Sequence, residues 1–142
     1  MPQLRHRADP HRRTRRDHET ETAEDYVEAV ADISDETGTC RVVDLARRFG
    51  VSHVTVTRII ARLQDEDLVR TQRYRPIELT AKGKRLAKRA RERHEIVFRF
   101  LLAVGVDART AAIDAEGIEH HVSPQTLARL REFTRSNGGD TS

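Results

Sequence analysis

Cysteine is almost absent from this chain, which has a single Cys40 among its 142 residues. One thiol excludes an internal disulfide framework and a cysteine-rich zinc module. The scarcity of cysteine agrees with a reducing compartment, and we expect a cytoplasmic protein. Cys40 itself is expected to be a small buried residue near the start of a helix.

Long apolar runs and aromatic residues are also scarce. No stretch approaches the roughly 18 apolar residues of a membrane helix, and no apolar secretion signal opens the sequence. The chain has no tryptophan and only 4% aromatic residues, which argues against a base-stacking platform for single strands. Its 142 residues suffice for one or two small domains but not for a large enzyme. We therefore expect neither a membrane partner nor an enzymatic activity.

Charge is abundant and is arranged in blocks. The net charge is only +3, although 35% of the residues are charged. Residues 19–38 contain eight Asp or Glu and no Lys or Arg, whereas residues 39–91 contain fourteen Lys or Arg and five Asp or Glu. A basic middle beside an acidic segment suggests a nucleic-acid footprint next to a group that binds cations. The alternative interpretation is that such runs are only solvated faces.

The spacing of apolar residues predicts a mainly α chain: an N-terminal winged helix-turn-helix followed by a helical C-terminal domain. We expect residues 1–18 to be a disordered basic arm, residues 19–80 the winged-helix domain and residues 81–142 the helical domain. The predicted elements are a helix from Thr22 to Gly38, a helix at residues 42–48, a helix capped by Ser52, an extended hairpin around Arg73, Arg75 and Pro76, a long helix from Ala81 to about Val104 capped by Thr80, and two helices capped by Asp107 and Ser123.

The second helix of the helix-turn-helix has the side chains that a recognition helix needs. Short polar groups and an Arg at its first turns can reach base edges in the major groove, while nearby Arg residues hold phosphates. With Val56, Ile60 and Leu63 buried, Thr55 and Arg58 are expected on a more exposed face. The candidate DNA-binding residues are Ser52, His53, Thr55, Thr57 and Arg58 in the helix, with Arg73 and Arg75 in the wing.

Three short stretches supply candidate metal ligands. Asp25 and Glu28 are three residues apart, which places both carboxylates on one helix face. The run AEGIEHH places Glu116, Glu119 and His120 at spacings of three and four, and RERHEIV supplies His94. Carboxylates and imidazoles without a thiolate suit Mn(II) or Fe(II) better than Cu(I) or a cysteine-type zinc site.

Each part of this candidate centre has a plainer interpretation. Asp25 and Glu28 could be ordinary surface acids, and a single His94 is more often a partly buried histidine than a ligand. Gly117 between acids is a poor choice for a plain helix face, so the EGIEH run is the more informative part. His121 cannot share a face with its neighbour and is expected to support a ligand or cap a helix.

Taken together, DYVE near the start, the helix-turn-helix with its wing, RHEIV and DAEGIEHHVS resemble the diphtheria-toxin-repressor-like family of metal-dependent repressors. The resemblance runs from about Thr22 to Phe133 and implies a winged helix that binds palindromic operator DNA and a C-terminal domain that forms a homodimer. It implies that six residues hold the metal: Asp25, Glu28, His94, Glu116, Glu119 and His120.

Two positions indicate the branch of that family. Its iron sensors usually have Met where this chain has Asp25, and Cys where it has Glu116. Both residues point to the manganese-transport regulator branch, which implies a manganese-responsive repressor of manganese transport genes with Fe(II) as a weaker activator. The alternative is an iron(II)-responsive repressor of the same family.

Two other functional classes fit the sequence less well. A carboxylate-bridged di-metal enzyme would use a Glu-x-x-His pair, which the six residues lack, and would leave the basic winged helix unexplained. A winged-helix regulator with an organic effector would leave the acidic cluster without a role.

Overall fold

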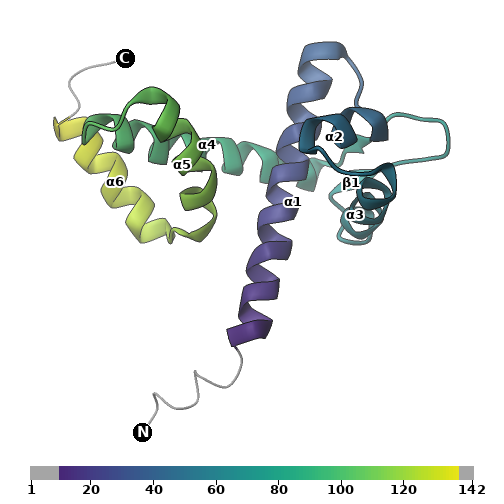
Figure 1. Ribbon diagram of the computed structural model, residues 1–142, viewed down its shortest axis with the longest axis horizontal. Helices are drawn as coiled ribbons and strands as arrows, with labels where there is room; N and C mark the ends of the chain where they lie inside the picture. The colour runs from purple at the N-terminus through teal and green to yellow at the C-terminus, as the bar shows by residue number, and fades with distance from the viewer. Residues whose placement is uncertain (1–9, 138–142) are drawn as a thin grey trace, which may run out of the picture. The chain divides into compact units, whose positions relative to one another are not determined.

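The computed structural model describes residues 10–137, with side chains from residue 18 onward. The chain is mainly helical with one small antiparallel sheet, as expected, and Figure 1 shows the order of its elements. They are α1 (Pro10–Thr37), α2 (Val42–Phe49), α3 (His53–Asp65), β1 (Val69–Arg70), β2 (Glu78–Leu79), α4 (Ala81–Ala103), α5 (Ala108–Ile118), a 3-10 turn (Glu119–His121) and α6 (Pro124–Asn137). Within residues 10–137, no helix is long and apolar enough to cross a membrane.

The chain divides into two compact units. One comprises residues 23–93, and the other combines the described residues up to Thr22 with those from His94 onward. The sequence-based boundary at residue 80 stays a prediction. We call the first the winged-helix unit and the second the C-terminal unit.

The winged-helix unit has the larger of two apolar cores. Val27 of α1, Leu45 of α2, Leu63 of α3 and Val69 of β1 are all fully buried in it. Cys40, two residues before the start of α2, is also fully buried. The expectation of a small buried residue near the start of a helix is confirmed. Burial of these side chains fixes the helices around α3, the predicted recognition helix.

The turn between α2 and α3 follows local sequence rules. Gly50 ends α2 with a φ of 65°, a left-handed conformation that glycine adopts without a steric penalty. Ser52 then caps α3, because its Oγ accepts a hydrogen bond of 3.1 Å from the backbone N–H of Thr55. Val56, Ile60 and Leu63 form the buried stripe of α3, as their spacing predicts.

The wing is a short hairpin tied to the start of α2. In β1 and β2, Val69 lies opposite Leu79. Beyond the sheet, the backbone N–H of Ile77 donates a 2.7 Å hydrogen bond to the carbonyl of Cys40. These contacts place the wing tip, residues 72–75, beyond the end of the two paired strands.

The first turn of α4 begins against the strand that opens the wing. Thr80 caps this helix, with its Oγ1 accepting a 3.0 Å hydrogen bond from the N–H of Gly83. A Cβ added to Gly83 would lie 2.0 Å from the carbonyl oxygen of Leu68, far inside van der Waals contact. Only glycine therefore allows α4 to start so close to β1.

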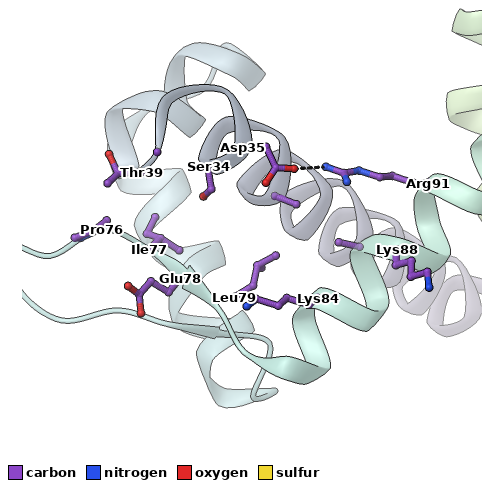
Figure 2. Close-up of a pocket in the computed structure, with 13 residues that line it drawn as sticks. Ser34, Asp35, Thr39, Pro76, Ile77, Glu78, Leu79, Lys84, Lys88 and Arg91 are labelled. Carbon is purple, nitrogen blue, oxygen red and sulfur yellow. Dashed lines mark ion pairs between the residues drawn. The ribbon is translucent and has the colours of Figure 1, made fainter.

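A cavity of about 590 Å³ lies between the end of α1, the strand β2 and the first half of α4 (Figure 2). Ile77, Leu79 and Ala87 contribute its apolar lining, and an ion pair of 3.5 Å joins Asp35 of α1 to Arg91 of α4. Arg91 also contacts Asp32. These pairs attach α4 to α1 at the edge of the core.

The C-terminal unit has its own small core. Val97 of α4, Ala115 of α5 and Leu127 of α6 are buried together. Near them the rings of Phe100 and Phe133 meet edge to face at 5.6 Å. This core holds α4 and α5 together. The candidate ligands of this unit lie on α4 (His94), on α5 (Glu116) and in the 3-10 turn that follows α5 (Glu119 and His120).

Two boundaries differ from the sequence-based expectation. Helix α1 begins at Pro10 rather than near Thr22, so the residues from 10 to 18 that were expected in a disordered arm are helical. Proline is favoured at the first position of a helix because its missing N–H has no partner there. Residues 1–9 of the predicted arm lie outside the described residues. Helix α5 stops at Ile118, so Glu119 and His120 follow in a 3-10 turn rather than on the helix.

Candidate metal centre and nucleic-acid interface

Glu119 is the central residue of the candidate metal centre. Its side chain is fully buried, although carboxylates are among the groups that are least often buried. Burying a carboxylate is costly unless a cation or hydrogen-bond donors lie against it. A carboxylate in this position therefore suits a bound cation.

Two histidines lie against the two oxygens of this carboxylate. The Nδ1 atom of His94 is 3.1 Å from Glu119 Oε2, and the Nε2 atom of His120 is 3.3 Å from Glu119 Oε1. The His120 side chain is 1% exposed. The buried Nδ1 of His94 makes no hydrogen bond to any described residue, so its lone pair can serve as a metal ligand.

Glu116 adds a second carboxylate to the same centre. Its Oε1 is 3.5 Å from His94 Nδ1, and its side chain is 59% exposed. Glu116 lies about one turn before Glu119, so both carboxylates reach His94 of α4 from the same side.

The donor atoms of His94, Glu116 and Glu119 fit a divalent cation. They lie within 4.8 Å of one another. Ligands at about 2.1 Å from one octahedral ion would be about 3 Å apart when adjacent and about 4.2 Å apart when opposite. Two oxygens and an imidazole nitrogen suit Mn(II), Fe(II) or Zn(II), with no preference for Cu(I).

The remaining predicted ligands are on α1. Asp25 and Glu28 are half-buried, one turn apart on the same helix face. They belong to the winged-helix unit, whereas His94, Glu116, Glu119 and His120 belong to the C-terminal unit. Participation of Asp25 and Glu28 in one centre with the other four stays a prediction.

Two further residues, His121 and Cys40, are not ligands in the predicted set. His121 is exposed, and its Nε2 lies 3.5 Å from Glu21 Oε2 in the C-terminal unit, a contact that the sequence did not indicate. Cys40 offers no thiolate, because burial, with a smaller effect from nearby Asp44, raises the pKa of its thiol to about 11.

The candidate DNA-binding residues of α3 fall into two groups. His53, Thr57 and Arg58 are exposed on the surface of the winged-helix unit. Thr55, expected on a more exposed face, is half-buried, and its Oγ1 accepts a 3.0 Å hydrogen bond from Ser52 Oγ. Ser52 and Thr55 thus hold the start of the helix, and their contact with DNA stays a prediction.

The wing and the start of α3 line one groove. This groove has a volume of about 440 Å³. It is lined by residues from the starts of α2 and α3 and from the wing, including Arg41, His53, Arg73, Tyr74 and Arg75. Four of these five carry or can acquire a positive charge, so the groove suits a phosphate backbone.

Three exposed residues of the winged-helix unit are absent from the sequence-based set. Arg41 precedes α2, Val54 is 76% exposed on α3, and Tyr74 is 83% exposed in the wing. Arg41 could have been found from the charge at the helix start. The spacing of apolar residues does not predict that Val54 and Tyr74 are exposed.

Comparisons with known proteins also separate a DNA-binding part of the chain from a metal-binding part. Residues 18–77 match the family model of the N-terminal DNA-binding domain of iron-dependent repressors, and residues 80–137 match that of their metal-binding and dimerisation domain. The transcriptional regulator MntR of Escherichia coli is 46% identical over 127 residues, which are 89% of this chain and 82% of that protein. The regulator MntR of Bacillus subtilis is 35% identical over 82% of both chains.

Solved structures show the same fold. The manganese regulator SloR superimposes with a TM-score of 0.70 at 28% identity over 80% of this chain, and a manganese-dependent repressor in complex with manganese does so with a TM-score of 0.67 at 27% identity over 79%. This chain spans about half the length of those two proteins, 53% and 52% respectively. The family named from the sequence is confirmed: the chain belongs to the iron-dependent repressors, regulators with an N-terminal DNA-binding domain and a C-terminal metal-binding and dimerisation domain.

Proposed function

We propose that this chain is a manganese-responsive repressor that acts in the cytoplasm as a homodimer on palindromic operators of manganese transport genes. The observation that carries the proposal is the set of His94, Glu116 and Glu119, whose donor atoms converge within the segment that matches the family's metal-binding domain. The names of its curated relatives, which are MntR regulators, favour manganese over iron.

Six residues hold the metal in this proposal. The four of the C-terminal unit, His94, Glu116, Glu119 and His120, are joined by Asp25 and Glu28 of α1. Four carboxylates and two imidazoles form a mostly hard ligand set, which is the type that Mn(II) accepts. Because Mn(II) is among the weakest binders of the divalent series, selectivity must come from ligand number and geometry.

The acidic ligands also supply the switch. Without a cation, four carboxylates brought together repel one another, and the state that brings them together is disfavoured. A bound cation offsets this repulsion and shifts the population toward that state. Since Asp25 and Glu28 lie on the helix that enters the winged-helix core, the metal and DNA affinities become coupled.

On the DNA, α3 occupies the major groove in the proposed complex. His53, Thr57 and Arg58 face the base edges, and Arg73 and Arg75 of the wing contact phosphates. Ser52 and Thr55 keep the first turn of α3 in place and can add phosphate contacts. A homodimer presents two such helices to half-sites about 34 Å apart, one turn of duplex.

A titration of labelled duplex DNA tests this function. The duplex is taken from the promoter of a neighbouring manganese uptake or efflux gene, and its fluorescence anisotropy is followed at fixed salt with chelator, Mn(II), Fe(II) or Zn(II). We expect tight binding with Mn(II), weaker binding with Fe(II), and only weak binding with chelator.

A scrambled duplex of the same length and base composition is the control, because phosphate contacts alone bind any sequence. Equal binding with and without metal would contradict the proposal. Stronger binding with Fe(II) than with Mn(II) would instead identify an iron-responsive repressor of the same family.

A further inference from the structure

The tip of the wing carries an aromatic ring that the fold does not use. The Tyr74 side chain is 83% exposed. We propose that Tyr74 is a DNA-contact residue, which packs its ring against the sugars of the minor groove next to the major groove that α3 enters. This inference rests on the proposed DNA-binding function and names a further residue that contributes to it.

The turn at the wing tip does not favour a tyrosine. The N–H of Arg75 donates a 3.0 Å hydrogen bond to the carbonyl of Gln72, so residues 72–75 form a β-turn. Tyr74 is the third residue of this turn and has a φ of 68°. Glycine or asparagine is the usual residue at such a position, because a Cβ is strained in the left-handed region. The tyrosine is therefore present despite the backbone conformation.

Packing within the fold does not account for the ring either. Its ring lies against the guanidinium of its neighbour Arg73, whose Cζ is 5.0 Å from the ring centre. A cation over the face leaves the other face of the ring open to a ligand. Residues held in strained backbone conformations tend to occur at functional sites.

The surroundings of Tyr74 indicate a duplex as the ligand. The groove that it lines also includes Arg41, His53, Arg73 and Arg75, and no Asp or Glu lines it. His53 opens α3, so a duplex that receives α3 in its major groove also meets the wing. The adjacent minor groove is about 6 Å wide, which admits single side chains, and its negative potential attracts Arg. Apolar side chains inserted there beside Arg are a common way to contact DNA.

Intrinsic fluorescence gives a direct test, because the chain has no tryptophan and only two tyrosines. Tyr26 is buried and stacked on Phe49, so Tyr26→Phe keeps the packed ring and leaves Tyr74 as the only emitting residue. We expect acrylamide to quench Tyr74 strongly in the free protein and several-fold less when Mn(II) and the promoter duplex are present. The matched control is Tyr74→Phe, in which the buried Tyr26 should respond to neither acrylamide nor DNA.

Affinity measurements complete the test. Tyr74→Asn removes the ring but suits the turn, and we expect it to weaken binding of the promoter duplex about tenfold, near the lower end of the loss when a ring stacked on a base is removed. Tyr74→Phe should bind as the parent does, and the urea midpoint of both variants should not fall. Replacing G·C by I·C pairs beside the half-site removes the minor-groove amino group and should strengthen binding of the parent more than of Tyr74→Asn.

Three results would overturn the inference: undiminished quenching of Tyr74 in the complex, full affinity in Tyr74→Asn, or an equal response of both proteins to I·C pairs. In each of these results the duplex is still bound in a metal-dependent way, and the proposed function stands. Absence of any metal-dependent binding by the parent protein would instead contradict the proposed function itself.

Discussion

At the scale of single residues, Glu119 is the group on which metal binding should depend most. It lies between His94 and His120 with no exposed side-chain surface. Glu119→Gln keeps the shape of the side chain but removes its charge and one of its ligand oxygens. We expect Mn(II) affinity to fall by more than about tenfold, since even residues that only orient a ligand are worth that much. Free Mn(II) counted by paramagnetic resonance during a titration measures the change.

The matched control for Glu119→Gln is Glu95→Gln. Glu95 is the residue after His94 on α4, but its side chain is 53% exposed and forms an ion pair with Arg99. The same change of charge at this position should leave the Mn(II) titration unchanged. Equal losses in both variants would mean that general charge, and not coordination by Glu119, governs the affinity.

The candidate site was predictable where spacing along one element decides the outcome. Glu116 and Glu119 reach His94 because three residues make about one turn, whether the turn is α or 3-10. The sequence did not reveal that Thr55 turns its hydroxyl toward Ser52, because one side-chain rotation decides between a cap and an exposed face. Tyr74 was missed for a related reason: its exposure follows from the turn that holds it.

At the scale of elements, the helix starts were predicted well because a cap is a local interaction. Ser52, Thr80, Asp107 and Ser123 were each expected as caps, and each accepts a hydrogen bond from the backbone N–H three residues later. The start of α1 was not predicted. Residues 10–17 are rich in charge and have no apolar stripe, so the pattern that identifies an amphipathic helix is missing there.

The cap of α5 provides a pH-dependent contribution to stability. The backbone N–H of Thr110 and, with a smaller effect, the Thr110 hydroxyl each donate a hydrogen bond to the Asp107 carboxylate. These hydrogen bonds lower the pKa of Asp107. Because the folded-state pKa lies below the unfolded value of about 3.9, the stabilisation is complete above that value and is lost as pH falls through the lowered pKa. Asp107→Asn retains a capping oxygen but does not titrate.

The expected result for Asp107→Asn is a weaker dependence of the urea midpoint on acid. Between neutral pH and pH of about 3, the parent should lose more of its stability than the variant does. Circular dichroism followed in urea at several pH values measures both. An identical loss in the two proteins would show that the Asp107 cap does not contribute to acid unfolding.

At the scale of the whole molecule, most of the apolar core is in the winged-helix unit, and the C-terminal unit has only a small cluster around Val97, Ala115 and Leu127. A ligand that binds only the folded chain stabilises it by mass action, by about 2.7 kcal/mol when its free concentration is 100 times Kd. We therefore expect saturating Mn(II) to raise the Tm by several degrees.

The difference between Mn(II) and Mg(II) in raising the Tm tests whether histidines take part in the site. Mg(II) keeps most of its water and binds imidazole poorly, so the same concentration of Mg(II) should leave the Tm nearly unchanged. Scanning calorimetry with chelator, Mn(II) and Mg(II) measures the three values. Equal rises with Mn(II) and Mg(II) would indicate general screening of the acidic groups and not a site with histidine ligands.

The close approach of Gly83 to the carbonyl of Leu68 has a genetic consequence. Every substitution at codon 83 adds a Cβ only 2.0 Å from the carbonyl oxygen of Leu68, the residue before β1. Glycine carries no group that binds a cation or reads a base, so a search for functional residues by chemistry would overlook it. Alleles altered at this codon should nevertheless behave as loss-of-regulation alleles, because either the backbone of the hairpin or the start of α4 must shift to make room for the side chain.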